Sequence, residues 1–205
     1  MNDPAYFAIT YCKVISLDKG LVPFKLYPYQ EEMFDHFNEN RFSIVLACRQ
    51  SGKSISSVAY LLWYAVFHSE KNIAILANKG ATAREMLARV TLMLENLPFF
   101  LQPGTKALNK GSIEFSNNSK ILAAATSGSS IRGLSINLLF LDELLSSVDQ
   151  DGVYNILKIL SQVIKENQIN TFVINHTVLP HEIFDKKLQI YRDNGFSKFE
   201  IESIE

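Results

Sequence analysis

The stretch Ala47-Cys48-Arg49-Gln50-Ser51-Gly52-Lys53-Ser54 decides the fold of this chain. It has the form [G/A]-x4-G-K-S, follows an apolar run at 42–46 and precedes a segment, 55–67, long enough for a helix. This order of strand, loop and helix predicts a phosphate-binding (Walker A) loop, because the N-terminus of a helix offers free N–H groups and a favourable dipole to anions. The alternative is an ordinary glycine turn with a surface lysine, and Ala47 departs from the usual first glycine.

The residues of this loop have separate expected tasks. Gln50, Ser51 and Gly52 would bring backbone N–H groups to the phosphates, and Lys53 would reach the β- and γ-phosphates. Ser54 would give an oxygen ligand to Mg²⁺. The pattern therefore predicts a nucleoside triphosphate and Mg²⁺ as the ligands.

A second motif lies downstream, where the apolar run 138–141 ends in Asp142 and Glu143. This is typical of a Walker B strand, in which Asp142 would hold Mg²⁺ through water and Glu143 would polarise the attacking water. The alternative is a strand that ends in a solvated acidic turn. An adjacent Asp–Glu pair favours an enzyme with its own catalytic glutamate over a GTPase-type switch.

The composition fits one globular domain. The chain has 205 residues, of which 47% are hydrophobic and 20% charged, enough for one sizeable core. It has no apolar run near the roughly 20 residues that span a bilayer, and no signal-peptide pattern, so we expect no membrane partner. Cys12 and Cys48 are too few for a disulfide scaffold and too isolated for a metal site, which favours a reducing intracellular compartment.

The charge distribution changes along the chain although the net charge is only −1. Residues 1–133 carry 14 basic and 10 acidic side chains, and residues 134–205 carry 6 and 11. The sign thus reverses close to Gly133. Charge also fluctuates along any chain of this length, so the change matters only because the motifs change at the same place.

The hydrophobic pattern predicts strands that alternate with helices. We expect helices at 29–37, 54–67, from a cap at Thr82 to about 96, and 152–166; strands at 42–46, 72–77, 137–141 and 171–174; and hairpins at 112–124 and 188–204, the second with an Asn194-Gly195 turn. This is an α/β fold of the P-loop NTPase class, a mostly parallel sheet with helices on both faces and a C-terminal β-hairpin, within one domain of residues 1–205. The strand before the loop should neighbour the strand that ends in Asp142, so that both sites meet at adjoining strand tips.

Several segments together resemble a known family. They are Tyr27-Pro28-Tyr29-Gln30, Cys48 to Ser54, Ile75-Leu76-Ala77-Asn78-Lys79-Gly80, Leu97 to Gly104, Asn109 to Glu114 and Ile131-Arg132-Gly133. In this order and spacing, over about residues 26–143, the chain resembles the ATPase domain of the large terminase subunit of T4-like tailed phages. That family is the motor that pumps DNA into the prohead.

The resemblance implies roles for further residues. Tyr29 and Gln30 would contact the adenine of ATP, and Arg49 would act in cis as an arginine finger on the γ-phosphate, where charge builds up in the transition state. The plainer alternatives are that Gln30 is a polar residue on a helix surface and that Arg49 is a solvated charge in the loop. Arg132 could contact phosphate or DNA, and Lys79 and Arg84 could follow a DNA backbone.

The family also implies partners and a location. They are double-stranded DNA, a portal, a small terminase subunit and a homo-oligomeric ring, in the cytoplasm of an infected bacterial host. The terminase pattern stops after Glu143, before the coupling strand and the nuclease domain of that family, so we expect no nuclease domain and no nuclease activity.

From about residue 134 the chain resembles a different family, the C-terminal part of an SMC-like ABC ATPase of recombination exonucleases. The segments are 141–152 and 172–177. This resemblance implies that His176 contacts the γ-phosphate and that Asp149 lies at a dimer interface, although the ABC signature and the long coiled coil are absent. We therefore expect a terminase-like part, 1–133, joined to an ABC-ATPase-like part, 134–205.

The first interpretation of function is an ATP-hydrolysing, DNA-dependent translocating motor of phage DNA packaging, truncated or hybrid. The alternatives are an ATPase subunit of a phage recombination exonuclease, or an ATP-binding module with little turnover. The join itself has three possible origins: natural recombination, a deliberate hybrid or an error of gene assembly.

Overall fold

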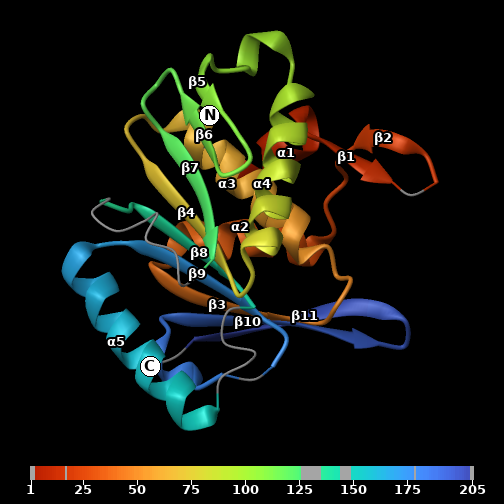
Figure 1. Cartoon of the computed structure of the whole chain (residues 1–205). Coiled ribbons are helices and arrows are strands. Elements are labelled where there is room, and N and C mark those ends of the chain that lie inside the picture. Colours follow the sequence, from red (N-terminus) through yellow and green to blue (C-terminus); the bar gives the residue numbers. More distant parts are fainter. Residues whose placement is uncertain (1–2, 17, 126–134, 144–148, 178, 204–205) are drawn as a thin grey trace.

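The computed structural model describes residues 3–16, 18–125, 135–143, 149–177 and 179–203 (Figure 1). In chain order its elements are α1 (Pro4–Tyr11), β1 (Lys13–Ser16), β2 (Gly20–Pro23), α2 (Pro28–Glu39), β3 (Phe42–Ala47), α3 (Lys53–Phe67), β4 (Asn72–Ala77), α4 (Gly80–Glu95), η1 (Phe99–Leu101), β5 (Thr105–Leu108), β6 (Ser112–Phe115), β7 (Lys120–Ala125), β8 (Leu138–Asp142), α5 (Gln150–Asn167), β9 (Asn170–Asn175), η3 (His181–Ile183), β10 (Lys186–Asp193) and β11 (Phe196–Ser203). Among these described residues, no helix is both long and apolar enough to cross a membrane.

One sheet of nine strands organises the molecule, in the order β11-β10-β3-β9-β8-β4-β7-β6-β5. The six strands from β10 to β7 run parallel to their neighbours, and the outer pairs β10–β11, β6–β7 and β5–β6 are antiparallel. This confirms the predicted α/β fold with a mostly parallel sheet and a C-terminal hairpin. Parallel strands of this kind bury both faces, which is why β3 and β4 are mainly apolar and nearly all of their residues are buried.

The order of the central strands corrects one expectation. β3 does not neighbour β8, because β9 lies between them and pairs in parallel with both. Leu46 pairs with Asn175, and Asp142 pairs with Ile174, so the carboxyl ends of all three strands still lie at the same edge. The residues that follow β3, β8 and β9 are therefore brought together.

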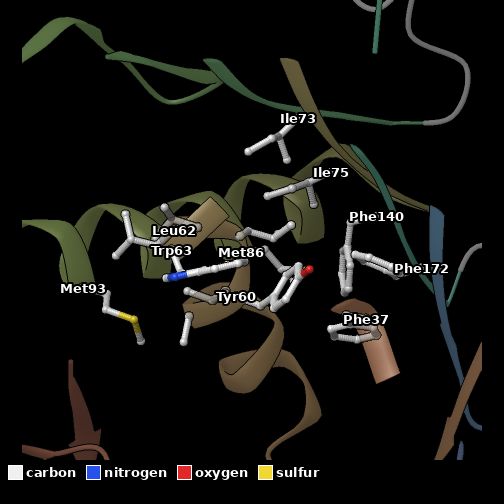
Figure 2. Close-up of a cluster of buried hydrophobic side chains, with 14 of the residues drawn as sticks. Phe37, Tyr60, Leu62, Trp63, Ile73, Ile75, Met86, Met93, Phe140 and Phe172 are labelled. Carbon is white, nitrogen blue, oxygen red and sulfur yellow. The ribbon is translucent and has the colours of Figure 1, made fainter. Parts of the chain in front are cut away.

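Two hydrophobic cores cover the two faces of the sheet. Alternate residues of β3 point to opposite sides, so that Val45 and Ala47 belong to one core, and Phe42, Ile44 and Leu46 to the other. Helices α1 to α4 pack on the first side, where Phe37 and Phe172 stack with ring centroids 4.3 Å apart (Figure 2). Helix α5 covers the second side (Figure 1).

Both predicted hairpins are present. β6 and β7 pair around the turn at 116–119, and β10 and β11 pair around Asn194 and Gly195. These two residues have φ values of 50° and 85°, the left-handed pair that a type I′ turn requires and that the Asn-Gly dipeptide favours.

Other local expectations were incomplete or wrong. Thr82 does not cap α4, because the helix already begins at Gly80 and Lys79 is its cap residue. Helix α1, the small sheet of β1 and β2, and the edge strand β5 were not predicted; every residue of β5 is exposed, so it lacks the alternation that marks a strand. Residues 131–133, which include Arg132, and residues 144–148 of the segment 141–152 lie outside the described residues.

Candidate nucleotide-binding site

The loop predicted to bind phosphate lies between the end of β3 and the start of α3. Gln50 and Gly52 have φ values of 60° and 74°, and this left-handed turn starts α3 at Lys53. The Ser51 hydroxyl donates to the Cys48 carbonyl at 2.9 Å. The Cys48 N–H donates to the carbonyl of Ile190 at 3.1 Å, which ties the start of the loop to β10.

The first turn of α2 supports the same loop from the side. The Tyr29 hydroxyl donates to the carbonyl of Ser51 at 2.8 Å, and Nε2 of Gln30 donates to the carbonyl of Gly52 at 3.4 Å. Oε1 of Gln30 accepts from the N–H of Tyr27 at 2.9 Å. Only 2% of Gln30 is exposed, so both polar atoms of the predicted adenine contact are engaged with backbone.

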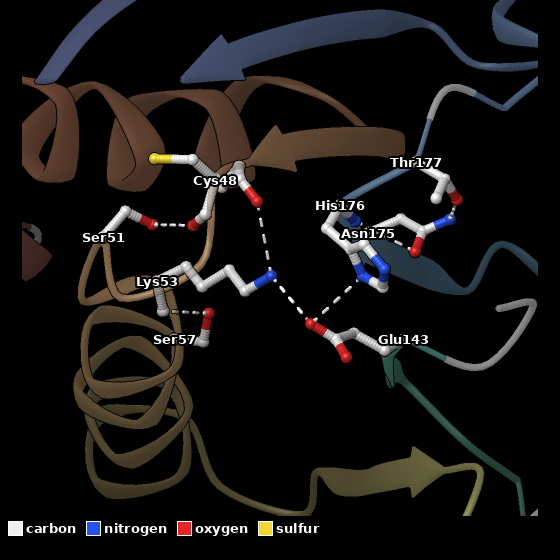
Figure 3. A network of polar contacts seen from close by, with 9 residues as sticks. Cys48, Ser51, Lys53, Ser57, Glu143, Asn175, His176 and Thr177 are labelled. Carbon is white, nitrogen blue, oxygen red and sulfur yellow. Dashed lines mark hydrogen bonds and ion pairs between the residues drawn. The ribbon is translucent and has the colours of Figure 1, made fainter. Parts of the chain in front are cut away.

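Lys53 meets Glu143 across the edge of the sheet (Figure 3). The Lys53 ammonium lies 2.9 Å from Oε1 of Glu143 and donates to the carbonyl of Ala47 at 3.4 Å. Nδ1 of His176 lies 3.5 Å from the same carboxylate oxygen. Residues 53, 143 and 176, which follow β3, β8 and β9, thus form one cluster.

The backbone of Glu143 is held in an unusual conformation. Its φ is 50°, and its N–H donates to the carbonyl of Ile174 at 2.9 Å. Burial acts to raise the pKa of Glu143, but the hydrogen bond and charge of Lys53, with the charges of His176 and Arg49, lower it below the usual value. Glu143 is therefore ionised at neutral pH, and its carboxylate is held next to three cationic or titratable groups.

Asp142 lies one residue earlier, at the buried end of β8. Burial, and then the charge of Glu143, raise the pKa of Asp142, while Lys53 and Arg89 oppose this shift. Its Oδ1 has no hydrogen-bond partner among the described residues. A buried carboxylate oxygen without a partner is costly unless a cation neutralises it, so this site fits the predicted Mg²⁺ ligand.

Ser54, the other predicted Mg²⁺ ligand, is the second residue of α3 and is half-buried. Arg49 is exposed in the loop, close enough for its charge to act on Glu143. Lys79 and Arg84, the candidates for a DNA backbone, are exposed at the N-terminal end of α4. Asp149 caps α5 by accepting from the N–H of Gly152 at 2.9 Å.

The sequence did not single out Asn175. It is 1% exposed at the end of β9, its Oδ1 accepts from the N–H of His176 at 3.0 Å, and its Nδ2 donates to the hydroxyl of Thr177 at 3.0 Å (Figure 3). This network sets the turn that directs His176 toward Glu143. The signal for it is a polar residue that ends a buried strand, a signal that many structural asparagines share.

A cavity of about 880 Å³ adjoins the loop, and Glu143 is not among the residues that line it. One wall is formed by the start of α2 and by the loop, and the other wall by the hairpin β10–β11. Its lining comprises Tyr27, Pro28, Tyr29, Gln50, Ser51, Gly52, Tyr191, Arg192, Gly195, Phe196, Ser197, Lys198, Phe199 and Glu200. No pattern in the sequence predicts that the hairpin lies beside the loop.

Comparison with solved structures shows that this fold is shared with large terminases and a helicase of bacteriophages. The large terminase of bacteriophage HK97 is 19% identical with a TM-score of 0.66, over 84% of this chain and 36% of that one. The large terminase ATPase domain of Thermus phage P74-26 is 15% identical with a TM-score of 0.58, over 74% and 65%. The UvsW helicase of bacteriophage T4 is 14% identical with a TM-score of 0.52, over 82% and 57%.

A large terminase of a thermophilic bacteriophage, similar at TM-scores of 0.52 and 0.51 and at 13% identity, has been solved with ADP and with ATP-γ-S. Our chain spans 38% of that chain and about a third of the HK97 large terminase. These likenesses establish the fold.

The sequence model of the family described as terminase large subunit, T4likevirus-type, N-terminal, matches residues 44–175. The match runs through the predicted join near Gly133 and ends at the last residue of β9, so it gives no support to a separate ABC-ATPase-like part from residue 134. The match covers more than half of the chain. The chain therefore belongs to the family of N-terminal domains of T4-like terminase large subunits.

Proposed function

We propose that this chain is the ATP-hydrolysing motor domain of a phage DNA-packaging enzyme, acting on double-stranded DNA in the cytoplasm of the infected bacterium. The observation that carries the proposal is the convergence of Lys53, Glu143 and His176 beside a loop with the phosphate-binding pattern. The family match and the likeness to large terminases support it.

In this proposal the loop holds the triphosphate. The N–H groups of Gln50, Ser51 and Gly52 face the phosphates at the start of α3, where the dipole favours negative charge. Lys53 leaves the carboxylate of Glu143 and binds the β- and γ-phosphates. Arg49, exposed in the loop, places its guanidinium on the γ-phosphate in cis.

The acidic residues supply the chemistry of hydrolysis. Asp142 and Ser54 would hold Mg²⁺, which neutralises charge on the phosphates when it is bound. Glu143, ionised and fixed by its backbone, accepts a hydrogen bond from the attacking water and directs a lone pair of the water at the γ-phosphorus. His176 contacts the γ-phosphate from the end of β9.

Tyr29 and Gln30 belong to the part of the site that would hold the adenine base. Their contacts to Ser51 and Gly52 support a task in holding the loop, in addition to the adenine contact that the family resemblance implies. The family further implies a ring of identical subunits on a portal, with a small terminase subunit. Lys79 and Arg84 are the proposed contacts to the DNA backbone.

The test is an ATPase assay with and without double-stranded DNA on the wild type, Lys53→Ala and the exposed control Lys165→Ala. We expect DNA-stimulated hydrolysis in the wild type and in the control, and a loss of at least about 100-fold in Lys53→Ala, because the charge on the phosphates is no longer neutralised. Unchanged turnover in Lys53→Ala would refute the site. ATP binding with no hydrolysis under any condition would select the binding module, and dimerisation on ATP through Asp149 would select the recombination ATPase.

A further inference from the structure

The hairpin β10–β11 extends past the end of β3 (Figure 1). Its far end lies across a cavity from Gln50, Ser51 and Gly52 of the phosphate-binding loop. Ile190 pairs with Ala47, the last residue of β3, and accepts the N–H of Cys48 at 3.1 Å. Beyond this pair the hairpin continues for its remaining residues alongside the loop rather than alongside a strand.

One face of the hairpin points at the start of α2. Cross-strand partners share a face, so Ile190 with Phe199, and Arg192 with Ser197, lie on the same side. Ile190 is buried in the core that α2 also covers, and Phe199 packs against that core. Arg192 and Ser197 therefore continue this face outward, opposite Tyr29.

The environment of Tyr29 agrees with this placement. Burial raises the pKa of its hydroxyl, while a hydrogen bond with Ser197 and the charge of Arg192 act to lower it. The hairpin is thus close enough to α2 to influence the residue that holds Ser51.

Between the two walls lies the cavity of about 880 Å³. On the α2 side, the rings of Tyr27 and Tyr29 stack at 5.5 Å and 6° between planes, and Tyr27 is 62% exposed. One aromatic face thus remains open in a cavity that ends at Gln50 and Gly52. An exposed aromatic ring is a platform on which a nucleobase can stack.

We propose that the nucleoside part of a nucleoside triphosphate binds in this cavity, with its base between Tyr27 and the hairpin residue Phe199, and that the hairpin is the second wall of the nucleotide site. The side chain of Gln30 already bonds Tyr27 and Gly52, so stacking on Tyr27 and the hairpin are contacts to the base in addition to any that Gln30 makes. The inference rests on the function proposed above, and adds binding residues from β11.

Two ligands separate the parts of the site: a non-hydrolysable ATP analogue and inorganic tripolyphosphate, each titrated with Mg²⁺ by calorimetry. Tripolyphosphate reports on the loop alone, and the analogue reports on the loop and the cavity. Tyr27→Ala and Phe199→Ala remove the two stacking partners. Ser197→Trp fills the cavity from a half-exposed position on the hairpin and keeps the test decisive if Phe199→Ala does not fold.

We expect Tyr27→Ala, Phe199→Ala and Ser197→Trp to raise the Kd of the ATP analogue roughly 5- to 100-fold, and to leave the Kd of tripolyphosphate within about twofold of the wild type. Matched controls are Ile201→Ala, on the same face of β11 but outside the cavity lining, and Ser161→Trp on α5. Both should bind both ligands as the wild type does.

The outcomes are distinguishable. Hairpin variants that fold and bind the analogue as tightly as the wild type overturn the inference and leave the proposed function intact. Equal losses for both ligands also overturn it, because the hairpin would then act through the loop. A wild type that binds neither ligand contradicts the proposed function itself.

Discussion

At the scale of single residues, the chemistry depends on the ion pair between Lys53 and Glu143. The two side chains meet at 2.9 Å although they are 90 positions apart, and 36% of the Glu143 side chain remains exposed. Lys53 is buried, with 8% of its side chain exposed, whereas the carboxylate of Glu143 reaches solvent, so a bound phosphate can replace this carboxylate and keep the ammonium of Lys53 paired. Glu143 then becomes available to a water molecule.

Glu143→Gln tests this division of tasks. The amide keeps the size of the side chain but cannot act as a base, so we expect ATP hydrolysis to fall by about 100- to 10,000-fold. The affinity for a non-hydrolysable ATP analogue should stay equal or increase, because Lys53 no longer has a carboxylate partner. Steady-state turnover and equilibrium titration measure the two effects, with the exposed Glu95→Gln as control. Loss of binding together with turnover would contradict the assignment of Glu143 as the base.

At the scale of elements, helix α2 and the phosphate-binding loop behave as one unit. Gln30 joins them through Tyr27 and Gly52, and a Cβ atom at Gly52 would come within 2.7 Å of Nε2 of Gln30. The glycine is thus required both for its φ of 74° and for the approach of the amide.

Gln30→Ala should therefore loosen the loop as a whole. It leaves the N–H of Tyr27 and the carbonyl of Gly52 without this side chain, and we expect a loss of about 1–3 kcal/mol in the free energy of unfolding. Affinity for the ATP analogue and for tripolyphosphate should fall together, since both depend on the loop. If only the ATP analogue is bound more weakly, Gln30 acts through adenine. Gln162→Ala, on the exposed face of α5, is the matched control.

At the scale of the whole molecule, helix α2 holds a buried histidine on the side that packs on the sheet. His36 is 0% exposed, and burial, with a smaller contribution from the charge of Lys186, lowers its pKa from 6.5 to about 4. The folded state therefore holds His36 neutral between these values, while the unfolded chain binds a proton. Stability must fall as the pH decreases from about 6.5 toward 4.

The size of this effect can be measured with His36→Leu. For one group the slope is up to about 1.4 kcal/mol per pH unit across that window. We expect chemical denaturation from pH 7 to pH 4.5 to show a steeper loss of stability in the wild type than in His36→Leu. Met33→Leu, a change on the same helix that removes no titratable group, should keep the wild-type slope. Parallel slopes in wild type and His36→Leu would show that His36 titrates normally.

The sequence by itself determined the local parts of this protein. The loop 47–54, the apolar runs that became β3, β4, β8 and β9, and the Asn194-Gly195 turn all depend on short-range chemistry: backbone conformation, alternation of burial and the φ values that glycine and asparagine accept. The α/β class and the two motifs followed from these parts, and the roles given to Lys53, Glu143 and Arg49 stay predictions until they are measured.

Only the tertiary structure decided how these parts meet. It placed β9 between β3 and β8, so that His176 faces Glu143, and it set the hairpin β10–β11 beside the loop. It also bonded both polar atoms of the Gln30 amide to backbone groups, the N–H of Tyr27 and the carbonyl of Gly52. The order of the strands and the position of the hairpin across the cavity from α2 depend on how the two apolar faces of the sheet pack against helices far away in the sequence. This packing is set by the total apolar area that the whole fold buries, which no local sequence pattern determines.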